Sequence, residues 1–450
     1  MIPVFEKIEK FLLLKCTQRS PLLLALSGGP DSLCLFYALL AFRERHQISF
    51  HIAHVDHAWR EESHAEALSL QLLAEKHCVP FHLKVLNPAD LKGNLEAVCR
   101  EERYAFFTDL CVDHSLQALL TGHHLDDQAE TILKRLLEGS RCQGLSGLQS
   151  DSMMRGCRVL RPLLEIKKKE ILDVLKALDI PAFDDPTNHQ SQFLRARMRQ
   201  SIIPELNRQF GKDIRNNLIA LGSESLELVD YFDKRCAPYL EKGLRGHLGY
   251  CLDLLPFMPI ERVELKYLLH VLGREHHFFL SREIIEMMAK SLISGKANQK
   301  FEMGRLRIEV DRHRLFILTA SKSNNSSLVP LDPGYLTIGD WKGVVEEKIF
   351  EADDQATDWK KGWLGSLHCY LPLGRYHIGF LDEAGKNKSN LGMIKKRWSQ
   401  SKVPAFLYHY FPLITGFSTI EHEFLTGKRT IQIKTGDRCM KVSFKKNDSF

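Results

Sequence analysis

Residues 22–32, LLLALSGGPDS, decide the fold class of this 450-residue chain. An apolar run that is typical of a buried strand changes at Ser27 into a turn with two glycines, and the apolar helical pattern LCLFYALLAF follows. Glycines let backbone N–H groups converge on an anion, and the dipole of the next helix favours negative charge there. Pro30 suits the first position of a helix, because that position needs no N–H donor. The stretch therefore predicts a strand, a phosphate-binding turn and a helix.

The turn is not a Walker phosphate loop, because no Lys-Ser or Lys-Thr pair follows at the required spacing. SGGPDS directly after a strand instead resembles the PP-loop of the N-type ATP pyrophosphatases, which split ATP into AMP and pyrophosphate. The resemblance implies an α/β fold of the adenine nucleotide alpha hydrolase type, with ATP as a substrate. An ordinary strand-to-helix turn is the alternative, since glycine and serine are common in loops.

The first half of the chain alternates between strand and helix patterns. Further strands are expected over residues 49–54, 81–86 and 117–121, with longer helical patterns between them. Parallel strands need such crossovers, so the alternation predicts a parallel sheet that helices cover on both faces. Ligands bind such sheets outside the carboxyl ends of the strands. The polar segments that follow the strands are therefore the candidate functional residues.

Two of these segments have more than one interpretation. Residues 54–57, HVDH, end the second strand and form either a solvated loop or a site for adenine or ribose. Glu96, Arg100 and Arg103 are spaced i, i+4 and i+7, so they share one face of a helix. That face is either an exposed ladder of ion pairs or part of the ligand site.

The segment 121–131, TGHHLDDQAET, is the most polar stretch to follow a predicted strand. Asp127 and Glu130 share a face near the start of a helix. They could hold Mg²⁺ that bridges ATP phosphates, or they could only complement the helix dipole. Zinc is disfavoured here, because the segment lacks the second histidine at helical spacing that a zincin uses.

Two basic stretches lack acidic residues. Arg195, Arg197 and Arg199 alternate along a helical pattern, and beside a phosphate site they would suit an anionic substrate or an RNA backbone. Residues 385–420 contain lysines interleaved with Trp398 and other aromatic residues. Basic charge with stackable rings fits RNA binding, and a solvated basic surface is the alternative.

Composition limits the class of protein. No apolar segment reaches transmembrane length, and the N-terminus lacks the features of a signal peptide, so no membrane partner is expected. The eleven cysteines form no CxxC pair, which indicates reduced thiols and a cytoplasmic location. The net charge of +6 permits an acidic partner.

Taken together, the motifs resemble the tRNA(Ile)-lysidine synthetase family. SGGPDS, HVDHAWREES, GNLEAVCREERYAFF, TGHHLDDQAETILKRLLEGS, GLSGL, RPLLEIKKKEI and DDPTNHQSQFLRARMRQSIIPEL stand in family order and cover most of residues 22–206. Three positions depart from the family pattern. Ala196 replaces a usual asparagine, Phe193 a usual tyrosine, and Ala58 with Trp59 a glycine and leucine.

The resemblance implies a ligase that modifies tRNA in two steps. ATP adenylates the C2 oxygen of the wobble cytidine in tRNA(Ile) with a CAU anticodon, and pyrophosphate leaves. Free L-lysine then attacks C2 and displaces AMP, which leaves lysidine. Implied domains are the PP-loop catalytic domain, a mainly helical middle domain and a smaller α+β tRNA-binding domain, at residues 1–210, 211–320 and 333–450. A homodimer is compatible with the sequence, which does not identify the lysine pocket or the features that exclude tRNA(Met).

The resemblance also implies roles for individual residues. The ATP-binding set is Ser27, Gly28, Gly29, Pro30, Asp31, Ser32, His54 and His123. The catalytic set is Asp31, Arg103, Asp127, Glu130 and Arg195. Asp31 and Asp127 are the candidate Mg²⁺ ligands, although which carboxylate serves metal and which serves lysine stays open. The tRNA-binding set is Arg197, Arg199, Lys395, Lys396 and Arg397.

Other functions share some of these features. A tRNA thiolase of the PP-loop superfamily would need paired or catalytic cysteines near the site, and Cys34, Cys99 and Cys142 form no CxxC. A PP-loop ligase that acts on a small metabolite would not explain the basic C-terminal stretch. A non-catalytic RNA- or nucleotide-binding protein would be expected to have damaged motifs, whereas SGGPDS and HHLDDQAET are intact.

Overall fold

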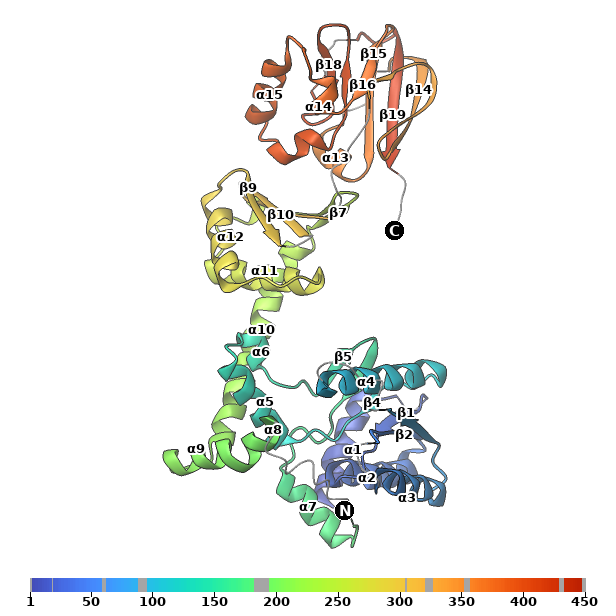
Figure 1. Cartoon of the computed structure of the whole chain (residues 1–450), viewed down its shortest axis with the longest axis vertical. Helices are drawn as coiled ribbons and strands as arrows, with labels where there is room; N and C mark the ends of the chain where they lie inside the picture. The colour runs from blue at the N-terminus through green and yellow to red at the C-terminus, as the bar shows by residue number, and fades with distance from the viewer. Residues whose placement is uncertain are drawn as a thin grey trace. The chain divides into compact units, whose positions relative to one another are not determined.

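A computed structural model describes the chain in two compact units, Met1–Asp230 and Tyr231–Phe450 (Figure 1). The described residues are 2–17, 19–58, 62–87, 95–181, 194–303, 306–319, 327–351, 357–428 and 433–446. Within this part of the chain, no helix is both long and apolar enough to cross a membrane.

The first unit contains a six-stranded sheet of order β3-β2-β1-β4-β6-β5. Five of its strands are parallel, and only β5 runs antiparallel to its neighbour β6. The strands are β1 (Leu22–Ala25), β2 (Phe50–Asp56), β3 (Phe81–Val85), β4 (Leu119–Leu120), β5 (Asp151–Met154) and β6 (Cys157–Leu160). The predicted parallel sheet is therefore confirmed, although β4 is shorter than expected.

Helices cover both faces of this sheet, which explains the continuous apolar run in β1. Successive strand residues point to opposite faces. Leu22 and Leu24 join a core with α1 (Pro3–Lys15), α2 (Pro30–His46), α3 (Glu62–Lys76) and α7 (Lys168–Ala177). Leu23 joins a second core with Tyr104 and Phe107 of α4 (Leu95–Asp113) on the other face.

The polar segments after β4 lead into further helices. They are α5 (Leu125–Leu137), α6 (Cys142–Leu145), α8 (Leu194–Arg197), a π-helix (Met198–Ile202), α9 (Ile203–Phe210) and α10 (Ile214–Leu240), in which the boundary between the units falls. The arginine segment thus forms a helix that is π-helical over one turn. π-Helical turns are rare and occur frequently at functional sites.

The second unit begins with a five-stranded antiparallel sheet of order β7-β8-β11-β10-β9 beside two helices. The elements are β7 (Leu244–Gly246), β8 (Gly249–Asp253), a 3-10 helix (Leu255–Phe257), α11 (Arg262–Glu275), α12 (Arg282–Ser294), β9 (Gln299–Met303), β10 (Leu306–Asp311) and β11 (Arg314–Leu318). The helices expected in this region are present, and the sheet adds to them.

The last part of the second unit contains two four-stranded antiparallel sheets, β12-β16-β17-β18 and β13-β14-β19-β15. Their core includes the fully buried rings of Trp341, Trp363 and Trp398. The strands are β12 (Val329–Pro330), β13 (Gly334–Ile338), β14 (Trp341–Ile349), β15 (Ser366–Pro372), β16 (His377–Gly379), β17 (Leu413–Thr415), β18 (Ile420–Glu423) and β19 (Arg438–Lys446). The helices are α13 (Trp359–Trp363), α14 (Leu381–Ala384), α15 (Leu391–Gln400) and a 3-10 helix (Ala405–His409).

Two leucines of α1 provide a matched test of this packing. Leu12 is fully buried against the sheet, whereas Leu14 is 84% exposed. We expect Leu12→Ala to lower the free energy of unfolding of this unit by about 2–5 kcal/mol, because it removes buried methyl groups and leaves a cavity. Leu14→Ala should change it by less than about 0.5 kcal/mol. Urea titrations followed by circular dichroism measure both, and equal effects would contradict the placement of α1.

Candidate functional site

The SGGPDS turn connects β1 to α2 at the carboxyl edge of the sheet. Gly29 is the N-cap and Pro30 begins α2, as predicted. Gly28 has φ of 83°, in the left-handed region that favours glycine. The Ser32 hydroxyl closes the turn, because it accepts from the Ser27 amide at 3.2 Å and donates to the Gly29 carbonyl at 3.0 Å. The loop is thus held in shape by its own side chains.

Gly122 supports this loop from the segment that follows β4. A Cβ atom at Gly122 would lie 3.2 Å from the carbonyl carbon of Asp31 and from the Ser32 nitrogen. That spacing is tighter than ordinary van der Waals contact, so a side chain here would push on the start of α2. Sequence reasoning did not single out Gly122, since only the fold brings it beside Asp31.

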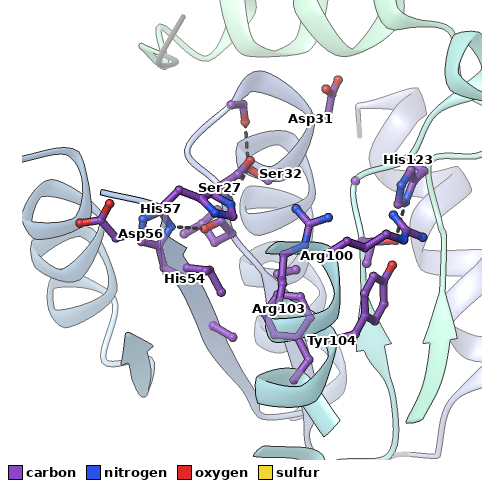
Figure 2. Close-up of a pocket in the computed structure, with 18 of the residues that line it drawn as sticks. Ser27, Asp31, Ser32, His54, Asp56, His57, Arg100, Arg103, Tyr104 and His123 are labelled. Atoms are coloured by element: carbon purple, nitrogen blue, oxygen red, sulfur yellow. Dashed lines mark hydrogen bonds between the residues drawn. The ribbon is translucent and has the colours of Figure 1, made fainter. Parts of the chain in front are cut away.

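A cavity of about 430 Å³ opens in front of the loop (Figure 2). This volume lies in the range of small-ligand sites. Of the predicted ATP-binding and catalytic residues, those that line it are Ser27, Gly29, Asp31, Ser32, His54, Arg103, His123 and Arg195. Arg100 and Tyr104 of α4 line it as well, so the polar face of α4 belongs to the cavity. Glu96 falls outside the residues whose side chains are described.

Three arginines, Arg100, Arg103 and Arg195, line this cavity together with the acidic residues Asp31, Asp56 and Glu66. Burial lowers the pKa of Arg103, and the nearby Arg100 and Arg195 lower it further. Arg100 and Arg103 lie 5.0 and 6.0 Å from the ring centroid of Tyr104, close enough for cation–π contact. Several guanidinium groups that repel one another in a partly buried space would be stabilised by a polyanion. The cavity therefore suits phosphate groups.

Two histidines in the cavity are neutral near pH 7. Burial lowers the pKa of His123 to about 4, with Arg161, Arg195 and Arg100 as further causes and Asp127 opposing them. Burial also lowers the pKa of His54, whose Nδ1 lies 2.7 Å from the Leu26 carbonyl oxygen. Nδ1 must carry the proton in that contact, so His54 Nε2 keeps a lone pair. The HVDH segment thus belongs to the site and is not a solvated loop.

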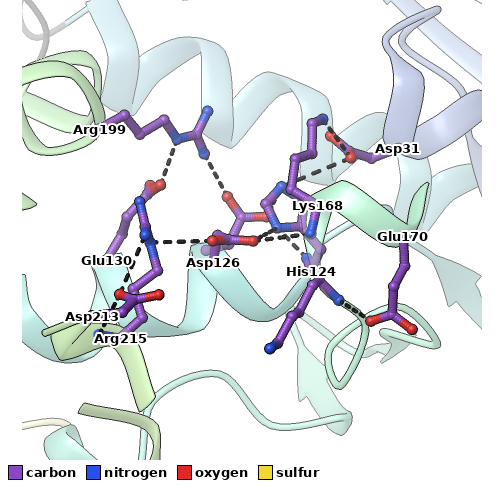
Figure 3. A network of polar contacts seen from close by, with 11 residues as sticks. Asp31, His124, Asp126, Glu130, Lys168, Glu170, Arg199, Asp213 and Arg215 are labelled. Atoms are coloured by element: carbon purple, nitrogen blue, oxygen red, sulfur yellow. Dashed lines mark hydrogen bonds and ion pairs between the residues drawn. The ribbon is translucent and has the colours of Figure 1, made fainter. Parts of the chain in front are cut away.

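A cluster of carboxylates and cations adjoins the loop (Figure 3). Arg199 donates to Asp127 and to Glu130, each at 2.5 Å. Lys168 donates to Asp31 at 2.6 Å. His124 Nε2 lies 3.8 Å from Asp31 Oδ1 and 3.5 Å from Asp127 Oδ2, so the two aspartates flank one imidazole. This cluster connects the start of α2 to the start of α5.

Burial affects the two carboxylates of α5 differently. For Asp127, burial alone would raise the pKa, but His124, Arg199 and the His124 amide together lower it. For Glu130, burial raises the pKa more than Arg199 lowers it. Asp127 accepts from the His124 amide at 3.0 Å and so helps to begin α5, whose N-cap is His124. Asp127 therefore has both a capping contact and a place in the cluster.

A second cavity of about 480 Å³ lies at this cluster. Its charged lining residues are Asp126, Glu130, Lys167, Lys168, Lys169, Arg199, Asp213 and Arg215, beside His124. Carboxylates and cations thus face one space, as a zwitterionic ligand would require. Sequence reasoning did not single out Lys168 or Arg215. The KKK run of residues 167–169 was the available signal, but its contact with Asp31 spans 137 positions.

The predicted tRNA-binding residues are divided between the two units. Arg197 is exposed, whereas Arg199 is held by the carboxylates of α5. Lys395 and Lys396 are exposed on α15, and Arg397 is half-buried there.

Among the aromatic residues of the C-terminal basic stretch, Trp398 cannot serve as a stacking ring, because it is fully buried and its Nε1 donates to Glu423 at 2.8 Å. The expectation of a stackable ring is therefore wrong for Trp398. The apolar face of α15 packs into the core, and the Trp398 ring lies on that face.

Two departures from the family pattern fall on described residues. Ala58 has φ of 50°, in the region that favours the glycine usual in the family. Ala196 is buried. Phe193 and Trp59 lie outside the described residues.

Gly122→Ala tests the support of the loop. We expect about tenfold weaker ATP binding, because the new methyl group displaces the backbone that would contact the phosphates. Gly392→Ala is the control, since a Cβ at that helical position meets nothing within 4 Å. Isothermal titration with ATP measures both variants. Unchanged affinity of Gly122→Ala would contradict the role of the packing.

Comparisons with known proteins agree with this geometry. The model of the PP-loop domain family matches residues 3–206. The tRNA(Ile)-lysidine synthase of Protochlamydia amoebophila (strain UWE25) is 42% identical over 442 residues, which are 98% of this chain and 96% of that protein. The tRNA(Ile)-lysidine synthase of Chlamydia muridarum (strain MoPn / Nigg) is 43% identical over 235 residues, which are 52% of this chain and 72% of that protein.

Among solved structures, the U34-tRNA thiolase NcsA from Methanococcus maripaludis is 19% identical with a TM-score of 0.41, over 50% of this chain and 78% of that one. That structural likeness is too weak to indicate a function. The 42% identity along nearly the whole of both chains indicates the family. This chain belongs to the tRNA(Ile)-lysidine synthase family.

Proposed function

We propose that this enzyme uses ATP to activate the wobble cytidine of a tRNA(Ile) with a CAU anticodon and then joins free L-lysine to it. In the first step the C2 oxygen attacks the α-phosphorus of ATP, and the bond to pyrophosphate breaks. In the second step an amine of lysine attacks C2, loses a proton and displaces AMP. The observation that carries the proposal is the adjacency of a PP-loop cavity lined by three arginines and a second cavity lined by carboxylates, lysines and arginines, where Asp31 of the first approaches His124 of the second.

The first cavity would hold ATP. Ser27, Ser32 and the loop amides would bind the pyrophosphate portion, and Arg103 and Arg195 would neutralise charge that develops on the phosphates. His54 offers a lone pair at Nε2 to the amino group of a base. The cytidine would have to leave the anticodon stack to reach the α-phosphorus.

Mg²⁺ is the expected companion of ATP, and the residues present fit it. Mg²⁺ binds through one or two carboxylates together with phosphate oxygens. Asp31 and Asp127 both lie within 4 Å of His124 Nε2, and each is balanced by a cation, Lys168 or Arg199. When bound, the ion would neutralise phosphate charge. Asp31 and Asp127 would hold it.

The second cavity is our candidate for the lysine site. A free amino acid carries an ammonium and a carboxylate, and its side chain adds a second amine. Asp126 and Glu130 could accept from the amines, while Arg215 could pair with the carboxylate. Glu130 suits an acceptor that also takes up a proton, because burial raises its pKa.

The thiolase alternative has less support. Among the described residues that line the two cavities, there is no cysteine. Cys34 lies in α2 behind the loop, where burial raises the pKa of its thiol to about 12. A thiol that stays protonated is a poor nucleophile.

Asp127→Asn tests the catalytic assignment. The amide keeps the shape and an acceptor for the His124 N–H but removes the charge. We expect at least about a 100-fold loss of lysidine formation with tRNA affinity nearly unchanged. Incorporation of radiolabelled lysine into a tRNA(Ile) transcript, with ATP and Mg²⁺ present, measures turnover. Exposed Asp173→Asn is the matched control, and wild-type turnover by Asp127→Asn would refute its role.

The same assay tests the proposed reaction. Incorporation should require the wobble cytidine, so a transcript with uridine at that position should accept no lysine. Incorporation of sulfur in place of lysine would favour the thiolase.

Exposed lysines of α15 provide a separate test of tRNA binding. Lys395→Glu with Lys396→Glu should weaken tRNA binding and lower the slope of log affinity against log salt by about 0.7–0.9 per lost phosphate contact. Lys290→Glu with Lys296→Glu makes the same charge change at two exposed lysines elsewhere in the second unit. If both double variants show the same salt dependence, α15 is not the tRNA surface.

A further inference from the structure

Three histidines meet at the amino-terminal edge of the parallel sheet. They are His51 in β2, His82 in β3 and His114 directly after α4. One ring nitrogen from each lies within 4.8 Å of the other two, and His51 Nδ1 is 3.0 Å from His82 Nε2. The ring centroids are 4.8–5.2 Å apart. Among the described residues, these three histidines form a group of three metal-ligating side chains that could surround one ion.

The sheet register brings these residues together. His82 pairs with Ala53 across the parallel ladder, and His51 lies two residues before Ala53. The side chains of His51, Ala53 and His82 therefore point to the same face of the sheet. Ala53 packs on that face against Phe107 and Leu110 of α4. His114 then lies where α4 ends over the same face. The spacing in the sequence, 31 and 32 residues between successive histidines, matches no short metal-binding motif.

This cluster is separate from the proposed active site. His51 and His54 belong to the same strand, but His54 lies toward the carboxyl end and lines the ATP cavity. His51 lies at the amino end, where parallel sheets of this type do not bind their substrates. The proposed reaction therefore makes no use of His51, His82 or His114.

We propose that His51, His82 and His114 bind one Zn²⁺ ion, which cross-links β2, β3 and the end of α4. Three imidazole nitrogens with one open position form a ligand set that Zn²⁺ accepts, at about 2.0–2.1 Å from each nitrogen. Two such ligands in tetrahedral geometry are about 3.3 Å apart, close to the His51–His82 separation. His114 is exposed, so the ion can enter from solvent.

The environment of the rings supports metal binding. Burial lowers the pKa of His51 and His82, and the neighbouring histidines lower them further. Both rings are thus neutral near pH 7, which is the form that binds metal. A hydrogen bond between His51 and His82 satisfies one pair of ring nitrogens, whereas a metal ion would engage all three residues. The alternative is that the three rings only pack against one another and bind no metal.

The expected consequence of the ion is stability. Arg100 and Arg103, in the first half of α4, line the ATP cavity. The helix ends at Asp113, directly before His114. A cross-link there would stabilise the position of the helix on the sheet without touching the reacting groups. Ligands that bind only the native state raise its stability by mass action.

Zinc binding to the metal-free, full-length protein tests the proposal. We expect one Zn²⁺ per chain by competition with a chromogenic chelator. His51→Gln and His82→Gln should each weaken binding at least about 100-fold, since even changes to groups around metal ligands cost 10–100-fold. His64→Gln is the control, because His64 is an exposed histidine of α3 in the same unit. Zinc should also raise the melting temperature of the wild type and of His64→Gln, but not of the two ligand variants.

Wild-type binding no tighter than that of the ligand variants would overturn the proposal, and so would an equal loss in His64→Gln. If the ligand variants fail to fold, as judged by circular dichroism, cobalt substitution of the wild type decides. Co²⁺ in a tetrahedral imidazole site produces intense visible bands, and X-ray absorption counts the imidazole ligands. Absence of these signals at one equivalent of Co²⁺ would also overturn it. Each of these readouts is independent of lysidine formation.

Discussion

The parallel pairing of β1 between β2 and β4 is the constraint on which the site depends. Because these strands run in one direction, the segments that leave them all emerge at one edge of the sheet. The SGGPDS loop, the HVDH segment and residues 121–123 thereby face a single cavity. Gly122 shows how close this arrangement is, since the space beside the loop leaves little room for a methyl group.

The second requirement is a balance of buried charge. Asp127 and Glu130 are nearly inaccessible, and neither could stay ionised without a cation nearby. Arg199 contacts both, and Lys168 contacts Asp31. Lys168 begins α7, which packs on the sheet, whereas Arg199 comes from the π-helical turn after α8. The turn that contains Arg199 is π-helical, and such turns alter the direction in which side chains project.

In the second unit, α15 has a charged exposed face and an apolar buried face. α15 buries Ile394 and Trp398 and exposes Lys395 and Lys396 between them. The aromatic rings that accompany basic residues in the sequence therefore serve chiefly to pack the core. Trp398 holds Glu423 through its indole N–H, whereas Phe417 of the same basic stretch is fully exposed.

Features that depend on neighbouring residues could be predicted from the sequence. The strand, glycine turn and helix of residues 22–46, with Pro30 at the first helical position, follow from local backbone preferences, and the alternation of strands and helices implied the parallel sheet. Which distant groups meet could not be predicted, because it depends on how the elements pack. The contact of Lys168 with Asp31, the packing of Gly122 on the loop, the burial of Trp398 and the approach of His51, His82 and His114 are examples. Local patterns specify the face and type of each element, but strand register and helix packing select partners that lie far apart in the sequence, 31 positions for His51 and His82 and 137 for Asp31 and Lys168.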